Sequence, residues 1–381
     1  MEDRRPPLDA LTSLRFVTAL HVFIFHLEAA RLVYAPEPFR RLASVGYVGV
    51  SWFFVLSGFI LAYAYAGRPI VLGHFWRARW RRVYPAYFLA LCIATPLFIY
   101  VLFYAPAMHD DASLAPMREH VTSFTLAAFV LVHAWIPAAA LGVNPVGWSL
   151  SAEAFFYFLF PMLLPRMASL SRRTLVYWVL AMAFLSAATA LAYVLRAPDG
   201  VSDVMFANND LFWLNVLRFN PLVRLPEFLV GVCGGLLYVR FRAAERWAAP
   251  LVSAGLFALF AVVVFEESIP YPLIHNGLMS LPFLAIIYGV ALRPWWSRFL
   301  EWRAFRRLGE VSYSFFLTHL LVIAVVLRPD GKYREIPFHE ALVCLVVSII
   351  LGFVLYRWVE QPFRYRSVSG AGAPAMVTNG H

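Results

Sequence analysis

Long apolar runs separated by short, arginine-rich connections make up almost the whole sequence. The runs fall near residues 9–31, 46–66, 84–105, 121–138, 149–165, 174–195, 225–240, 250–266, 276–292, 309–327 and 338–358. Most of them are close to the roughly 20 residues that an α-helix needs to cross the hydrocarbon core of a bilayer. The pattern therefore predicts an all-α, polytopic bundle of membrane-spanning helices.

Charge indicates which of these runs cross the membrane. Of the 32 Lys and Arg residues only Lys332 is a lysine, and the arginines cluster in the short connections. Such connections tend to stay in the cytosol. If segment 121–138 does not cross, most arginines lie inside; if it crosses, every later connection is inverted and most lie outside. We therefore predict about ten spans with both termini cytosolic, and a re-entrant or interfacial segment at 121–138.

Composition supports the same class. The chain is 61% hydrophobic and 14% charged, whereas soluble domains average about 45–50% and 25%. The net charge of +10 follows the positive-inside pattern, which argues against a nucleic-acid partner. The three cysteines all lie in apolar runs and predict neither a disulfide framework nor a metal site. We expect one membrane-embedded domain over 1–366 and a disordered cytoplasmic tail over 367–381.

The first run carries polar residues at a depth where they are unfavourable. Buried ionisable side chains in a membrane helix cost several kcal/mol, so they usually face a protein interior or an aqueous cavity. At about 100° and 1.5 Å per residue, Arg15 and His26 fall within about 20° of one helix face and about 16 Å apart, while His21 points elsewhere. This face is our candidate catalytic centre. Alternatively, Arg15 extends to the head groups and His26 is a hydrogen-bonded packing residue.

A cluster of arginines precedes the third run. The stretch HFWRARWRRVYP contains Arg77, Arg79 and Arg82 and ends at Pro85, which suits the first turn of a helix. Guanidinium groups bind phosphate through paired N–H donors, and a helix N-terminus favours anions. We predict that these arginines bind a phosphate-bearing ligand. The alternative is that they only anchor the topology.

Later runs contribute further polar candidates. Trp148 and Glu153 begin a run among aromatic residues, which would desolvate the carboxyl group and suit it to acid–base work. His319 places another imidazole inside a span, where packing and function explain it equally well. Compensation of the helix dipole is a simpler explanation for a carboxylate at a helix start, and we adopt it for Glu227.

These pieces together resemble one family along nearly the whole chain, the bacterial membrane-bound acyltransferase 3 family of O-antigen and exopolysaccharide acetylases. The similar motifs are, in order, Arg15-x10-His26, Gly46-x-x-Gly49-Val with Phe-Phe-Val-Leu-Ser57-Gly58, Arg79-x-x-Arg82-x-x-Pro85, Trp148-Ser-Leu-x-x-Glu153 and Ser312-Tyr-x-x-x-Leu-x-His319. Each motif is weak alone, but their order and the topology together are specific.

The resemblance implies an enzyme of the bacterial cytoplasmic membrane that moves an acyl group, commonly acetyl, from cytosolic acyl-CoA to a hydroxyl of a sugar or glycoconjugate. It implies acyl-CoA as co-substrate, with no permanently bound cofactor and no metal. The site residues it implies are His26, Arg15 and Glu153 for catalysis, Arg79, Arg82 and Arg77 for the donor, and Glu153, His319 and Trp148 for the acceptor. His26 would serve as general base or transient acyl carrier.

Other functions stay open from the sequence. A proton-coupled transporter or exporter would also bury Arg, His and Glu side chains. A non-enzymatic partner in polysaccharide assembly would tolerate the loss of His26. The acceptor of an acyltransferase could also be a small glycosylated metabolite instead of a surface polymer.

Overall fold

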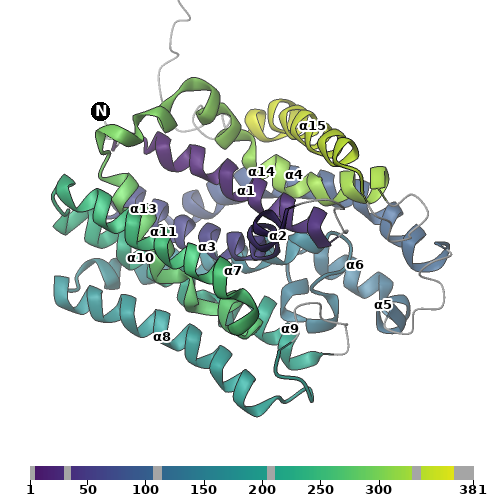
Figure 1. Ribbon diagram of the computed structural model, residues 1–381. Coiled ribbons are helices and arrows are strands. Elements are labelled where there is room, and N and C mark those ends of the chain that lie inside the picture. The colour runs from purple at the N-terminus through teal and green to yellow at the C-terminus, as the bar shows by residue number, and fades with distance from the viewer. Residues whose placement is uncertain (1–4, 30–35, 106–113, 204–210, 328–335, 364–381) are drawn as a thin grey trace, which may run out of the picture.

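The computed structural model describes residues 5–29, 36–105, 114–203, 211–327 and 336–363, and they form a layered bundle of helices (Figure 1). The helices of the first half are α1 (Asp9–Ala29), α2 (Glu37–Ser44), η1 (Gly46–Val48), α3 (Gly49–Tyr65), α4 (Leu72–Phe103), α5 (Ala115–Glu119), α6 (Val121–Phe129), η3 (His133–Trp135), η4 (Pro137–Ala139), η5 (Pro145–Gly147), α7 (Trp148–Ala168) and α8 (Arg172–Arg196). Those of the second half are α9 (Phe212–Phe219), α10 (Pro221–Phe241), η6 (Glu245–Trp247), α11 (Ala248–Phe265), η7 (Glu266–Ser268), α12 (Tyr271–Leu273), η8 (Ile274–Leu278), α13 (Ser280–Ala291), η9 (Trp295–Glu301), α14 (Arg303–Leu327), α15 (Phe338–Leu355) and η10 (Tyr356–Glu360). The predicted tail 367–381 lies outside the described residues.

The helix lengths confirm the predicted all-α, polytopic membrane class. Within the described ranges, nine helices are long and apolar enough to cross a membrane, or ten if a bent pair is one span. That pair is Tyr271–Leu278 with Ser280–Ala291, which meet at 42°. Segment 121–138 forms only the nine-residue α6 and short turns, and Leu131 leaves the helical conformation with a φ of 60°. The segment is too short to cross as a helix, in agreement with the predicted re-entrant or interfacial piece.

Glycines hold the central helix α3 and the preceding turn η1 against their neighbours. A Cβ atom at Gly58 would lie 2.2 Å from the carbonyl oxygen of Phe228 in α10, and one at Gly46 would lie 2.5 Å from the carbonyl oxygen of His21 in α1. Small residues allow this close approach of helix backbones in membranes. These glycines of the predicted motif are therefore packing residues, and α3 and α10 run side by side through the bundle (Figure 1).

The start of α4 differs from the sequence prediction. Pro85 was expected in the first turn of a helix, but α4 begins at Leu72 and Pro85 lies in its interior. Arginine is a good helix former, and a membrane helix tolerates an internal proline when neighbours satisfy the freed backbone groups. Arg79 and Arg82 are consequently on one face of a helix and not in a loop, three residues apart.

Candidate active site

A cavity of about 1060 Å³ lies between α1, α3, α4, α7, α14 and η10. Its lining has more cations than anions. The arginines are Arg5, Arg15, Arg68, Arg79, Arg82 and Arg306, and the carboxylates are Asp9, Glu310 and Glu360. Arg306 pairs with Asp9 at 3.5 Å. Because the cationic groups outnumber the acidic ones two to one, the cavity suits an anionic ligand with several charges.

Two of the three arginines predicted on α4 line this cavity. Arg79 lies 5.8 Å from the ring of Phe75 and 6.0 Å from the ring of Tyr157. Its Nε atom is buried and has no hydrogen-bond partner among the described residues. A buried donor without a partner is unusual in a folded protein and fits a site that awaits an acceptor. Arg77, by contrast, is exposed and is not among the lining residues, because two residues turn a helix by about 200°.

Glu153 supports the cavity wall from behind. It accepts hydrogen bonds from Ser57 Oγ at 2.8 Å and from the hydroxyl of Tyr157, and both of those residues line the cavity. The indole of Trp76 donates to the Tyr157 carbonyl oxygen at 3.2 Å. The structure thus brings Glu153 to Tyr157 beside Arg79, where its carboxylate orients two hydroxyl groups.

His26 and His319 form a hydrogen-bonded pair. The Nδ1 atom of His26 lies 3.0 Å from the Nε2 atom of His319, and the Nδ1 atom of His319 lies 2.7 Å from the carbonyl oxygen of Phe316. A carbonyl oxygen only accepts, so Nδ1 of a neutral His319 carries the proton and its Nε2 accepts from His26. This network, from which we assign the protons, leaves the lone pair of His26 on Nε2.

Aromatic rings surround this histidine pair. His319 is fully buried, and the rings of Phe23, Phe315 and Phe316 lie within 6.1 Å of its own. Phe25 packs against His26 at 5.1 Å. These rings restrict the access of water to the imidazoles.

His21 points away from this pair. Its Nε2 atom lies 2.6 Å from the carbonyl oxygen of Leu42, which follows α1 in the chain. The structure therefore gives His21 a partner in α2, as expected for a packing residue on a different face of α1.

The structure does not bring all predicted residues into one place. Arg15, Arg79 and Arg82 share the cavity, whereas His26 is absent from its described lining and contacts His319 instead. Eleven residues separate Arg15 from His26 on one face of α1, about 16 Å along the axis. Helix α1 therefore contributes to two chemically different sites, the arginine-lined cavity and the imidazole pair.

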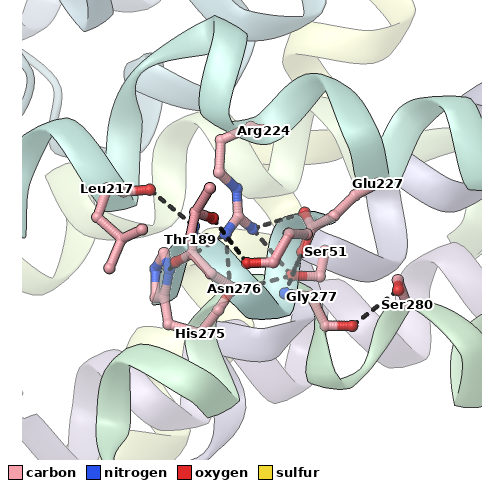
Figure 2. A network of polar contacts seen from close by, with 10 residues as sticks. Ser51, Thr189, Leu217, Arg224, Glu227, His275, Asn276, Gly277 and Ser280 are labelled. Atoms are coloured by element: carbon pink, nitrogen blue, oxygen red, sulfur yellow. Dashed lines mark hydrogen bonds and ion pairs between the residues drawn. The ribbon is translucent and has the colours of Figure 1, made fainter. Parts of the chain in front are cut away.

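The sequence analysis did not predict a third cluster of polar residues. Figure 2 shows Arg224 of α10 between Glu227 and the broken segment η8. Arg224 and Glu227 form an ion pair of 2.8 Å, and both side chains are buried. Arg224 donates to the His275 carbonyl oxygen at 2.7 Å, and Glu227 accepts from the Gly277 N–H at 3.1 Å. Gly277 has a φ of 86°, so the helix is interrupted there.

The buried ion pair completes the hydrogen bonding of that interruption. Backbone groups left unsatisfied in a membrane cost several kcal/mol each, and the pair satisfies one carbonyl and one N–H. Our interpretation of Glu227 as a dipole-compensating residue is therefore wrong, because its carboxylate pairs with Arg224 of the same helix and accepts the Gly277 N–H of the broken segment. The Asn-Gly dipeptide at 276–277, a turn signal inside an apolar run, was the available clue. Trp148 belongs to this region, with its ring 5.8 Å from Arg224.

The fold and these two sites define a polytopic helical membrane protein with an arginine-lined cavity at one end of α1 and a paired imidazole at the other. The chain belongs to an acyltransferase family, because the family model described as an acyltransferase domain matches residues 8–357. It is therefore an acyltransferase.

Relatives of named activity agree with this family. The chain is 27% identical to Acyltransferase MdmB of Streptomyces mycarofaciens, over 98% of this chain and 97% of that protein. It is 23% identical to O-acetyltransferase OatA of Staphylococcus aureus (strain NCTC 8325 / PS 47), over 94% of this chain and 57% of OatA. It is 28% identical to putative peptidoglycan O-acetyltransferase YrhL of Bacillus subtilis (strain 168), over 95% and 56%. The chain thus spans little more than half of the last two proteins. No solved structure matches it.

Proposed function

We propose that this enzyme transfers an acetyl group from cytosolic acetyl-CoA to a hydroxyl of a sugar-containing acceptor at the cytoplasmic membrane. The observation that carries the proposal is the arrangement on α1, with Arg15 in a cavity of six arginines and His26 about 16 Å further along the same face. Two relatives are named O-acetyltransferases, and one of these names specifies peptidoglycan. The acceptor is accordingly a surface glycan or, as the alternative, a small glycosylated metabolite.

The cavity would hold the nucleotide end of the donor. Coenzyme A carries a diphosphate and a 3′-phosphate, and arginine recognises phosphate through paired donors. Arg79 and Arg82 offer such donors on one face of α4, and the partnerless Nε of Arg79 is one of them. Arg15 would then hold the donor's phosphates, because it is too far along α1 from His26 to stabilise charge on a thioester located there. The flexible arm of the donor would extend along α1 toward His26.

At the imidazole pair, His26 would act as general base. Its Nε2 atom removes the proton from the acceptor hydroxyl while that oxygen attacks the thioester carbonyl carbon. The C–O bond forms and the C–S bond breaks, and the departing thiolate takes the proton from His26. The products are the ester and free CoA, and His26 returns to its neutral form. His319 would keep the proton of His26 on Nδ1 and so keep its lone pair on Nε2.

Transfer of a labelled acyl group tests this proposal. The purified protein in lipid nanodiscs is supplied with radiolabelled acetyl-CoA and either a surface-glycan fraction or a fraction of glycosylated metabolites. We expect label in one acceptor fraction and equimolar release of free thiol, and His26→Gln should remove both signals. A protein that moves solute across proteoliposomes without consuming acetyl-CoA would instead support a transporter.

A further inference from the structure

A second cavity of about 270 Å³ adjoins the first one. The two share Arg5, Pro6, Leu8 and Tyr63, so the Arg5 and Tyr63 side chains form the partition between them. The remaining lining residues of the smaller cavity are Tyr238, Val239, Arg242 and Arg293. None of these four residues at the ends of α10 and α13 lines the larger cavity, so the smaller cavity is a separate compartment beside it.

Three guanidinium groups from separate parts of the chain converge on this small cavity. Arg5 precedes α1, Arg242 caps α10, and Arg293 follows α13. Arg5 Nη2 donates to the Ala66 carbonyl oxygen at 2.7 Å. Arg242 Nη2 donates to the Leu292 carbonyl oxygen at 3.3 Å. Backbone carbonyl oxygens therefore hold two of these three side chains, and all three line one cavity although their like charges repel one another.

Capping of helix C-termini is the simpler explanation for these arginines, since cations there compensate the helix dipole. It does not explain why guanidinium groups from three separate parts of the chain line the same cavity. Dipole compensation also does not require the backbone conformation of Arg293. This residue has a φ of 60°, in the left-handed region that residues other than glycine rarely adopt. Arg293 keeps an ion pair with Glu301 at 3.2 Å, so three cations with this one carboxylate leave the cavity positive.

We infer that the second cavity binds a phosphate ester, and that in the donor complex this ester is the 3′-phosphate of CoA. The inference rests on the proposed function. The 3′-phosphate branches from the ribose, away from the diphosphate, so a donor whose diphosphate lies in the larger cavity needs a second anion site beside it. The shared wall of Arg5 and Tyr63 places the smaller cavity in that position. A phospholipid head group offers the same chemistry, and the experiment separates the two sources.

The test removes the phosphate from the ligand and the guanidinium from the protein. Rates of acetyl transfer are measured in nanodiscs with acetyl-CoA and with acetyl-dephospho-CoA. Because a charge-assisted contact is lost, we expect the wild type to prefer acetyl-CoA by roughly 10- to 100-fold in kcat/KM. Arg242→Ala and Arg293→Ala should raise KM for acetyl-CoA and leave acetyl-dephospho-CoA unchanged, which removes the preference. Arg242→Lys should keep part of it, because lysine lacks the planar fork.

Arg246→Ala is the matched control, because Arg246 is exposed on the neighbouring η6 and is not among the residues that line either cavity. It should keep the full preference. Variants that slow both donors equally, or neither, would overturn the inference. A preference that survives while the variants lose activation by phosphatidylglycerol nanodiscs would assign the site to a lipid head group and overturn the CoA assignment. A wild type that uses neither donor would instead refute the proposed function.

Discussion

Replacement of His319 by glutamine or asparagine separates a positioning role from a packing role. In the structure His319 accepts a hydrogen bond from His26 through Nε2 and donates to the Phe316 carbonyl oxygen through Nδ1. A glutamine amide reaches about as far as Nε2, and an asparagine amide reaches only about as far as Nδ1. His319→Gln can therefore still accept from His26, whereas His319→Asn can still contact Phe316 but leaves His26 without this acceptor.

The expected magnitude follows from the hydrogen bond that is lost. A bond to a group that becomes charged in the transition state contributes about 1.5–3 kcal/mol, which corresponds to roughly 10- to 150-fold in rate. We expect His319→Asn to lose about that much in kcat, and His319→Gln to stay within roughly tenfold of the wild type. KM for acetyl-CoA should not change in either variant, because His319 is not among the residues that line the donor cavity.

The assay measures initial rates of labelled acetyl transfer in nanodiscs containing equal amounts of folded protein, verified by size-exclusion chromatography. The split between kcat and KM is the decisive readout, because a merely structural role predicts that both amides disturb the fully buried site alike. Equal losses in the glutamine and asparagine variants, or a loss expressed in KM, would refute the assignment of His319 as the residue that positions His26.

Three further predictions follow from the other sites. Arg79→Ala should raise KM for acetyl-CoA about tenfold or more, while Arg77→Ala, exposed on the same helix, should not; donor titrations would contradict this if both behave alike. Glu227→Ala should cost about 3–5 kcal/mol, because Arg224 stays buried and uncompensated, and thermal unfolding in detergent should register the loss. A reporter fused at Arg172 should indicate the cytosol, and an external signal would mean that the proposed orientation is inverted.

The membrane spans were predictable because each depends on the length of a local apolar run. The start of α4 was not, since an arginine-rich stretch before Pro85 has the composition of a connection, and only the surrounding helices show that it continues as a helix. The arginine cluster nevertheless predicted that Arg79 and Arg82 bind a phosphate-bearing ligand, and both line the cavity because residues three apart share a helix face.

Contacts between residues far apart in the chain could not be predicted from the sequence. His26 and His319 are 293 positions apart, and no local pattern indicates that their rings meet. The same holds for Glu227, whose N–H partner is 50 residues away in a broken helix. A single sequence reveals which polar residues are unusual for a membrane helix, but their partners depend on how the helices pack.

The packing of α1 explains how the arginine-lined cavity and the imidazole pair can act on one donor. Gly309 of α14 approaches α1 so closely that a Cβ atom there would lie 2.0 Å from the Thr12 carbonyl oxygen. Ten residues further along α14, His319 meets His26 of α1, which fixes the register of the two helices at a second level. Arg15 lies between these two contacts, so the distance from the arginine cavity to the imidazole pair is set by rigid helices and not by loops. A transferase that presents a long thioester donor to a fixed base needs such a rigid separation, because a displacement of about 1 Å at the reacting atoms can cost on the order of 100-fold in rate.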